Sequence, residues 1–167
     1  LKFGLWFEPE MVSPDSDLYR THPDWVIHKD GINPIRGRRQ LVLDFTRQEV
    51  VDYIFRVIAD ILRSNDISYV KWDMNRFITE CYSASLPSYR QGEFMHRYIL
   101  GVYELANRLT TEFPKVFFEG CAGGGGRFDA GMLYYFPQIW TSDDTDGYER
   151  AKIQWGTSLC YPVSGMS

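Results

Sequence analysis

The chain of 167 residues has few of the residues that build metal sites or disulfide frameworks. Its 3 cysteines, Cys81, Cys121 and Cys160, are an odd number at wide spacings, which excludes a disulfide framework and a zinc ribbon. Such thiols suit a reducing compartment, so we expect a cytoplasmic protein. Its 3 histidines form neither a His-x-His pair nor an HExxH motif, which leaves only magnesium held by carboxylates as a metal site. We expect no metal and no cofactor.

Long apolar runs and an excess of positive charge are also absent. No run approaches the roughly 20 residues that span a bilayer, so we expect no membrane partner. Lys and Arg total 18 against 22 Asp and Glu, a net charge of -4, and nucleic acid as a partner needs a basic face instead. No Gly-x-Ser-x-Gly motif occurs, which disfavours a serine hydrolase. Aromatic residues are abundant at 16%, and that much ring surface suits a thick core or a sugar-stacking pocket.

The first residues begin without an initiator Met and resemble a strand already in progress. The last ones, 161–167, resemble the approach to another element. We therefore expect the chain to be an internal piece of a longer protein.

Apolar runs of strand length recur, and each has an acidic residue at or near its end. They are Phe3–Phe7, Leu41–Phe45, Ile67–Trp72, Val116–Phe118 and Gln138–Thr141. Continuous apolar runs indicate strands that are buried on both faces, as in a parallel sheet covered by helices.

The segments between these runs have helical patterns. Thr46 to Glu49 fits a capping box, and the apolar residues from Val50 to Leu62 follow it at helical spacing. A second helix is predicted from Phe94 to Leu109, with Met95 on its apolar face, and shorter helices over 129–135 and 148–159. The segment 9–39, rich in Pro and Asp, is predicted to be a long loop with one short helix.

This alternation predicts an α/β fold. A (β/α)8 TIM barrel uses about 250 residues for eight units, so five strands in this chain match about five-eighths of a barrel. Residues 1–167 would then be part of a (β/α)8 catalytic domain. A doubly wound open sheet has the same alternation and is the alternative.

Active-site residues of a barrel lie at the carboxyl ends of its strands, where the acidic residues of this chain gather. Lys71 and Asp73 share a strand face, so both can contact one ligand, although an ion pair of Asp73 with Lys71 or Arg76 would explain them equally well. Asp143 begins a second acidic cluster, in which helix capping accounts for at least one residue. Two carboxylates on separate strand ends are the minimum machinery of a glycosidase.

The glycine-rich stretch 120–126 fits neither a dinucleotide nor a P-loop fingerprint. We interpret it as a place where the backbone approaches a small polar ligand, with a flexible connection as the alternative. Trp6 is either part of the core or a platform for a sugar.

Four ordered motifs resemble glycoside hydrolase family 36, the microbial α-galactosidases or melibiases. They are Gly4–Met11, Lys71–Arg76, Glu119–Gly125 and Thr141–Asp146. The resemblance implies a retaining double displacement on terminal α-galactosides such as melibiose and raffinose. It makes Asp73 the nucleophile and Asp143 the acid/base. It also implies galactose contacts at Trp6, Arg38, Lys71, Asn75, Cys121 and Gly124. Because Lys71 shares a strand face with Asp73, we expect it to help keep Asp73 ionised as well.

Members of that family also carry flanking β domains and an acidic pair on an earlier strand, and neither is in this chain. The resemblance further suggests a bacterial, cytoplasmic parent enzyme that is a homo-oligomer and has a small oligosaccharide as its partner. Two alternatives remain open. One is a galactosyl transferase of the raffinose-synthase type, and the other is a non-catalytic sugar-binding fragment.

Overall fold

The structure is a computed structural model that describes all 167 residues. Its residues form two compact units whose segments alternate along the chain. The first unit comprises Leu1–Glu8, Leu62–Asn75 and Thr110–Ser167, and the second comprises Pro9–Ile61 and Arg76–Leu109.

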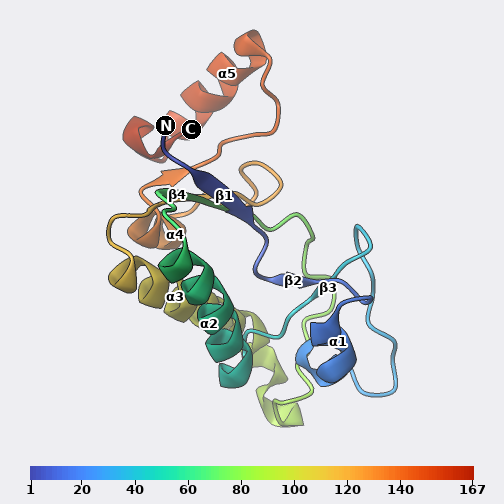
Figure 1. Cartoon of the computed structure of the whole chain (residues 1–167). Helices are drawn as coiled ribbons and strands as arrows, with labels where there is room; N and C mark the ends of the chain where they lie inside the picture. Colours follow the sequence, from blue (N-terminus) through green and yellow to red (C-terminus); the bar gives the residue numbers. More distant parts are fainter. The chain divides into compact units, whose positions relative to one another are not determined.

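The first unit is built on a four-stranded parallel sheet (Figure 1). Its strands are β1 (Gly4–Phe7), β4 (Tyr69–Trp72), β5 (Phe117–Gly120) and β6 (Gln138–Ile139). Their order in the sheet, β1-β4-β5-β6, follows their order in the sequence. The predicted α/β class with a parallel sheet is therefore confirmed.

The two faces of this sheet differ. Val70 and Trp72 are buried, whereas Lys71 between them is half-buried. Phe136 packs against the buried face, with its ring centroid 5.4 Å from that of Trp72 and 5.7 Å from that of Phe118. One face is thus apolar and packed, and the other carries polar side chains.

Two helices of the first unit begin at aspartate caps. α4 (Ala130–Tyr135) is capped by Asp129, which accepts a hydrogen bond from the Met132 N–H. α5 (Gly147–Ser158) is capped by Asp146, so the prediction that one acidic residue of that cluster serves as a cap is confirmed. A short 3-10 turn, η3 (Val163–Gly165), follows.

The second unit holds the segment that we expected to be the second strand of the parallel sheet. Strand β3 (Leu41–Val42) instead pairs antiparallel with β2 (Met11–Val12). The expectation of five parallel strands is therefore wrong, and the parallel sheet has four. Two short helical segments precede β3, namely α1 (Asp17–Thr21) and η1 (Pro23–Trp25). The apolar run from Leu41 to Phe45 is nevertheless fully buried, which is why its pattern imitates a sheet-core strand.

The two long helices are α2 (Gln48–Ser64) and α3 (Phe94–Glu112), the latter preceded by η2 (Ser88–Glu93). Most of the predicted apolar stripes are buried, but Met95 is exposed. The predicted capping box at the start of α2 does not form, because the Thr46 hydroxyl donates to Asp44 Oδ1 at 2.6 Å. α3 approaches the backbone of Phe45 at Gly101, where an added Cβ would lie 2.0 Å from the Phe45 carbonyl oxygen.

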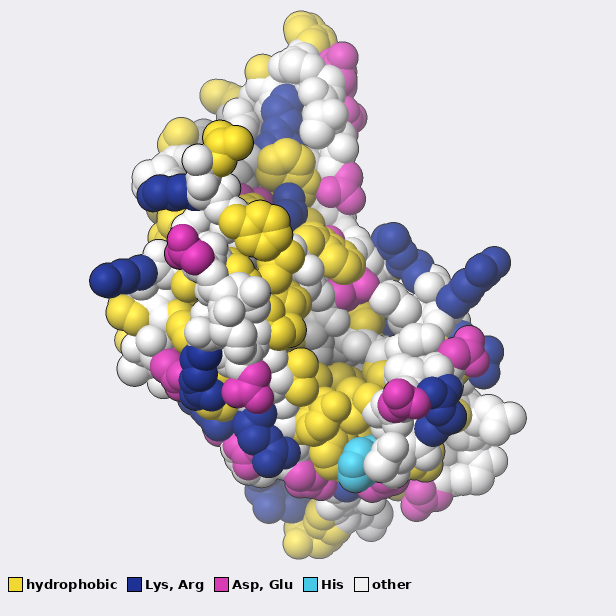
Figure 2. Space-filling view, in the orientation of Figure 1, with side chains coloured by type: hydrophobic (Ala, Val, Ile, Leu, Met, Phe, Trp, Pro, Cys, Tyr) yellow, Lys and Arg dark blue, Asp and Glu magenta, His cyan; other side chains and the backbone are white.

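No helix of the structure is long and apolar enough to cross a bilayer. On the face drawn in Figure 2, Lys and Arg side chains are interspersed with Asp and Glu side chains rather than gathered in one field.

Candidate active site

The carboxyl ends of the four parallel strands bring most of the predicted site residues into the first unit. The register aligns Trp6 with Lys71 and Lys71 with Glu119, so these three residues form one row across β1, β4 and β5. The polar face described above carries this row. Trp6 is 53% exposed, which rules out its alternative role in the core and leaves its indole available to a ligand.

Asp73 directly follows β4, and both of its carboxylate oxygens accept hydrogen bonds from neutral donors. Oδ2 accepts from Trp6 Nε1 at 3.1 Å and from Asn75 Nδ2 at 2.7 Å. Oδ1 accepts from the backbone N–H groups of Met74 at 2.8 Å and Gly123 at 3.2 Å. The side chain is therefore held in one orientation by residues from three strand ends.

These donors determine the ionisation of Asp73. Burial by itself raises the pKa of this carboxyl, but hydrogen bonds from Asn75, Cys121, Trp6 and Gly123 outweigh burial and hold the pKa below its usual value. A buried carboxylate kept ionised by neutral dipoles, without a cation to neutralise it, suits a nucleophile.

Cys121, which follows β5, is buried beside Asp73. Burial raises the pKa of its thiol to about 12, and the neighbouring Asp73 carboxylate adds to this increase. The thiol therefore stays protonated at neutral pH and acts as a donor to Asp73 rather than as a reactive thiolate.

Lys71 has a different partner from the one that we predicted. Its ammonium lies 3.2 Å from Glu119 Oε1, and burial and Glu119 together raise the pKa of the neighbouring Tyr69 hydroxyl. The alternative explanation of this motif, an ion pair of Asp73 with Lys71 or Arg76, is therefore wrong, because Lys71 pairs with Glu119 and Arg76 with Glu80.

The acidic cluster after β6 separates into three roles. Asp146 caps α5, and Asp144 Oδ1 accepts a hydrogen bond from the Asp146 N–H at 3.1 Å. Asp143 is exposed, and its Oδ1 accepts a hydrogen bond from the indole Nε1 of Trp140 at 2.9 Å. Asp143 is therefore the member of the cluster that local turn formation does not explain.

The glycine-rich loop touches both candidate acids. Gly123 donates to Asp73, while a Cβ on Gly124 would lie 3.0 Å from the backbone nitrogen of Asp143. A Cβ on Gly125 would lie 2.3 Å from the Thr141 carbonyl oxygen. Gly123 and Gly124 also have positive φ angles, of 55° and 86°. The glycines allow two backbone segments to approach each other, whereas we predicted a backbone approach to a ligand.

Arg38 belongs to the second unit, where it lies in a two-residue turn. The backbone groups of Gly37 and Gln40 exchange hydrogen bonds of 3.0 and 2.8 Å across the turn. Arg38 and Arg39 have φ angles of 51° and 63°, a left-handed conformation that Asn and Gly adopt at a lower cost. Arg38 is exposed, so this costly conformation presents a cation to the solvent.

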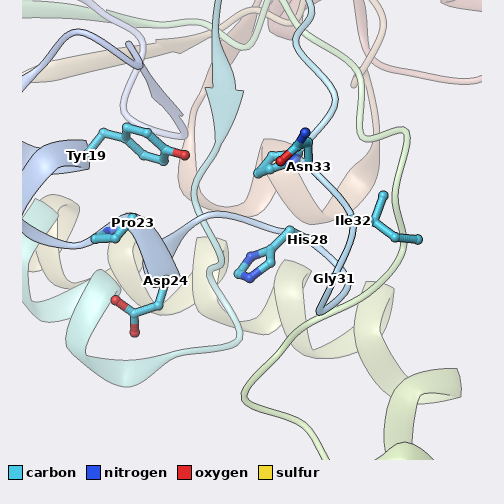
Figure 3. Close-up of a pocket in the computed structure, with 8 residues that line it drawn as sticks. Tyr19, Pro23, Asp24, His28, Gly31, Ile32 and Asn33 are labelled. Atoms are coloured by element: carbon cyan, nitrogen blue, oxygen red, sulfur yellow. The ribbon is translucent and has the colours of Figure 1, made fainter.

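A surface pocket of about 480 Å³ contains none of the predicted site residues. It lies within the second unit and is lined by Tyr19, Pro23, Asp24, His28, Gly31, Ile32, Asn33 and Pro34. Tyr19 and Asn33 point toward each other across it, while the Asp24 carboxylate points away (Figure 3). Asp24 lies 3.4 Å from the guanidinium of Arg47. This pocket has one acidic lining residue, Asp24, and so lacks the pair of acids that a glycosidase needs. No group of His, Cys, Asp or Glu side chains is arranged to hold a metal ion.

The sequence profile of the family described as Melibiase matches residues 1–167. The chain belongs to this family. It is 58% identical to the α-galactosidase AgaA of Geobacillus stearothermophilus, over 99% of this chain and 23% of that protein. It is 56% identical to the α-galactosidase Mel36A of Lactobacillus acidophilus, over 100% of this chain and 23% of that protein.

Solved structures agree with this membership. The crystal structure of AgaA superposes with a TM-score of 0.97 at 58% identity, covering 100% of this chain and 23% of that one. The chain thus spans about a quarter of the length of the melibiase relatives that it matches.

Two residues of the site were missed by the sequence analysis. Glu8 Oε1 accepts a hydrogen bond from the Asn75 N–H at 2.9 Å and so fixes the backbone beside Asp73. Trp140 holds Asp143, as described above. The only available signal was position, since Glu8 ends the first apolar run and Trp140 lies three residues before Asp143.

Proposed function

We propose that the protein containing this chain is a retaining α-galactosidase that hydrolyses terminal α-galactosides by double displacement. Asp73 is the nucleophile, and Asp143 is the general acid of the first step and the general base of the second. The observation that carries this proposal is the contrast between the two acids. Asp73 is buried and held ionised by five neutral donors, while Asp143 is exposed and accepts one indole hydrogen bond.

Two carboxyl groups in different environments are what the chemistry needs. The nucleophile must be ionised and aimed at the anomeric carbon, as the fixed carboxylate of Asp73 would be. The acid/base must exchange its proton with a leaving group and then with water, which an exposed carboxyl at the rim of the site can do. The loop through Gly123 and Gly124 joins the two groups without introducing a further titratable side chain.

Related structures support the assignment. One AgaA structure with a substituted aspartate contains raffinose, and another with a different substituted aspartate contains stachyose. Those two aspartates are 70 positions apart, and so are Asp73 and Asp143. A third AgaA structure contains 1-deoxygalactonojirimycin. We therefore propose galactose-terminated oligosaccharides as the substrate class, with Trp6, Lys71, Asn75, Cys121, Gly124 and Arg38 as galactose contacts.

The order of the sheet supports a (β/α)8 barrel as the parent fold. In a doubly wound sheet the strand order reverses at a switch point, whereas in a barrel each strand lies beside the next one in the sequence. The parallel strands here follow one direction without a reversal. The β2–β3 strand pair then belongs to the long connection that follows β1. Barrel enzymes differ from one another mainly in such loops at the carboxyl ends of their strands.

Chemical rescue in the complete protein tests the two roles. Asp143→Ala should still form the galactosyl-enzyme from a nitrophenyl α-galactoside, because this leaving group needs no proton, and should then stall. Azide needs no general base and should restore turnover, giving the α-galactosyl azide, because it displaces Asp73 from the α face of the β-linked galactosyl-enzyme. Asp73→Gly should instead give the β-azide, because azide enters the vacated β face and displaces the α-linked leaving group once. Interchanged anomers would reverse the assignment, and an Asp144→Ala variant with the Asp143→Ala pattern would move the acid by one residue.

The same assay separates the alternatives. A galactosyl transferase would transfer galactose to an added sugar acceptor in preference to water. A sugar-binding protein would bind the substrate without turnover in any variant.

A further inference from the structure

Trp140 contacts both the parallel sheet and the loop that carries Asp143. Its backbone N–H donates to the Gly120 carbonyl at 2.8 Å, which fixes the residue at the end of β6. Its indole Nε1 donates to Asp143 Oδ1 at 2.9 Å. The side chain that holds the proposed acid/base is thus anchored to the sheet itself, although Asp143 lies in an exposed loop.

Two cations lie over the Trp140 ring. Lys71 Nζ is 4.0 Å and Arg150 Cζ is 4.2 Å from the ring centroid. Each cation is itself held in place, Lys71 by Glu119 at 3.2 Å and Arg150 by the Ser142 carbonyl at 2.5 Å. Cations over an indole are attracted to its face, so these contacts fix the ring plane and therefore the direction of its N–H.

We propose that Trp140 is the positioning residue of Asp143 and determines which carboxyl oxygen carries the transferred proton. An indole N–H can only donate, so Oδ1 of Asp143 must act as an acceptor in both protonation states. The acidic proton therefore lies on Oδ2, and the same oxygen accepts a proton from water in the second step. This inference rests on the proposed role of Asp143.

The contacts argue against a role for Trp140 as a sugar platform. Sugar stacking needs an open ring face, which Trp6 offers with 53% exposure. The Trp140 ring instead has Lys71 and Arg150 over it. Each proposed catalytic aspartate is thus held by its own indole, and only Trp6 is free to contact galactose as well.

The test compares two substrates in the complete protein. Raffinose has a sugar leaving group that needs a proton, whereas the nitrophenolate of a nitrophenyl α-galactoside leaves largely unaided. Trp140→Phe keeps an aromatic ring beneath the cations and removes the pyrrole ring together with its N–H donor. It should lower kcat/KM for raffinose by about 10- to 100-fold and that for the nitrophenyl substrate by less than about 3-fold. It should also lower kcat for the nitrophenyl substrate, and azide should restore it.

Trp6→Phe is the matched control, because it removes the N–H donor to Asp73 instead. It should lower kcat/KM for both substrates by the same factor, without rescue by azide. Equal losses for both substrates in Trp140→Phe, or no loss, would overturn the proposal. Trp140→His returns a ring N–H and should recover part of the raffinose activity, while a loss equal to that of Trp140→Phe would also overturn it.

Asp143→Ala, measured in parallel, separates this inference from the proposed function. If Asp143→Ala shows no difference between the two substrates, the assignment of the acid fails and the Trp140 inference fails with it. If Asp143→Ala shows the difference and Trp140→Phe does not, only the role of Trp140 is wrong.

Discussion

Replacing Asn75 with Ala should move the acidic limb of the pH profile to higher pH. The Asn75 amide donates to Asp73 Oδ2 at 2.7 Å, a shorter bond than those from Trp6, Met74 and Gly123, and it favours the ionised form. The backbone of Asn75 is held separately by Glu8 at 2.9 Å, so the truncation leaves the chain in place. The loss of the donor is then the main consequence of the substitution.

The size of the shift follows from the strength of such a bond. A hydrogen bond to an ionised group contributes about 1.5–3 kcal/mol, and one pKa unit corresponds to about 1.4 kcal/mol. The pKa of Asp73 should therefore rise toward its ordinary value, by no more than this free energy allows. Water that enters the vacated space would recover part of the bond and make the rise smaller.

The direction of the shift can be checked by linkage. The folded-state pKa of Asp73 lies below its unfolded value, so Asp73 stabilises the fold above the unfolded pKa, and this contribution is lost as the pH falls through the folded pKa. Asn75→Ala reduces that contribution at neutral pH, so the melting temperature should fall as well. In the proposed mechanism Asp73 must be ionised to act as the nucleophile, so kcat/KM should fall at a higher pH in the variant than in the wild type.

The assay is kcat/KM for a nitrophenyl α-galactoside as a function of pH, which reports the ionisation of the free enzyme. Ser68→Ala is the control, because it removes an exposed hydroxyl that donates to the Phe3 carbonyl at 3.1 Å and does not touch Asp73. The reasoning is refuted if Asn75→Ala lowers kcat/KM uniformly and leaves its acidic limb where Ser68→Ala leaves it.

Three further predictions concern stability and reactivity in the complete protein. Gly101→Ala should destabilise the fold by about 1–3 kcal/mol, because the new Cβ meets a backbone carbonyl. Gly156→Ala in α5 should stabilise it by about 0.5–1 kcal/mol, because the new Cβ meets nothing within 4 Å. Thermal unfolding measures both changes. Arg38→Gly and Arg39→Gly should each relieve a positive φ and stabilise the fold by about 0.5–1 kcal/mol. Only Arg38→Gly should raise KM for the galactoside. Equal KM values in the two variants would mean that Arg38 does not contact the substrate. Cys121 should resist alkylation at pH 8 until urea unfolds the protein, because its pKa of about 12 leaves only about 1 thiolate in 10,000, and rapid native labelling would contradict this.

The sequence predicts the strand ends well because two different signals meet there: an apolar run indicates a buried strand, and the acidic residue after it indicates a functional position. An apolar run followed by an acid identified β1, β4, β5 and β6, together with the motif around Asp73. The same pattern failed at Leu41–Phe45, since an apolar run records burial but not which strand it pairs with. Pairing depends on contacts distant in the sequence, and no local pattern encodes them.

Side-chain partners were harder to predict than positions. Lys71 and Asp73 share a strand face, which suggested that they interact, but cross-strand register places Glu119 directly beside Lys71. The bond from Trp140 to Asp143 depends on how the chain turns after β6, and a span of three residues in a loop does not specify that turn. Exposure alone decided between the two roles of Trp6, and exposure is a property of the folded sheet.

The glycine-rich loop shows why backbone contacts can fix a catalytic distance. The separation of the two carboxyl groups decides between retention and inversion in glycosidases, so it must be held closely. One end of this separation is set by the Gly123 N–H on Asp73, and the other by the contact of Gly124 with the backbone at Asp143. Neither contact involves a rotatable side chain of the loop, so rotamer changes there cannot alter the spacing. A run of glycines, which alone looks like a flexible connection, therefore contacts both of the aspartates that we propose as catalytic.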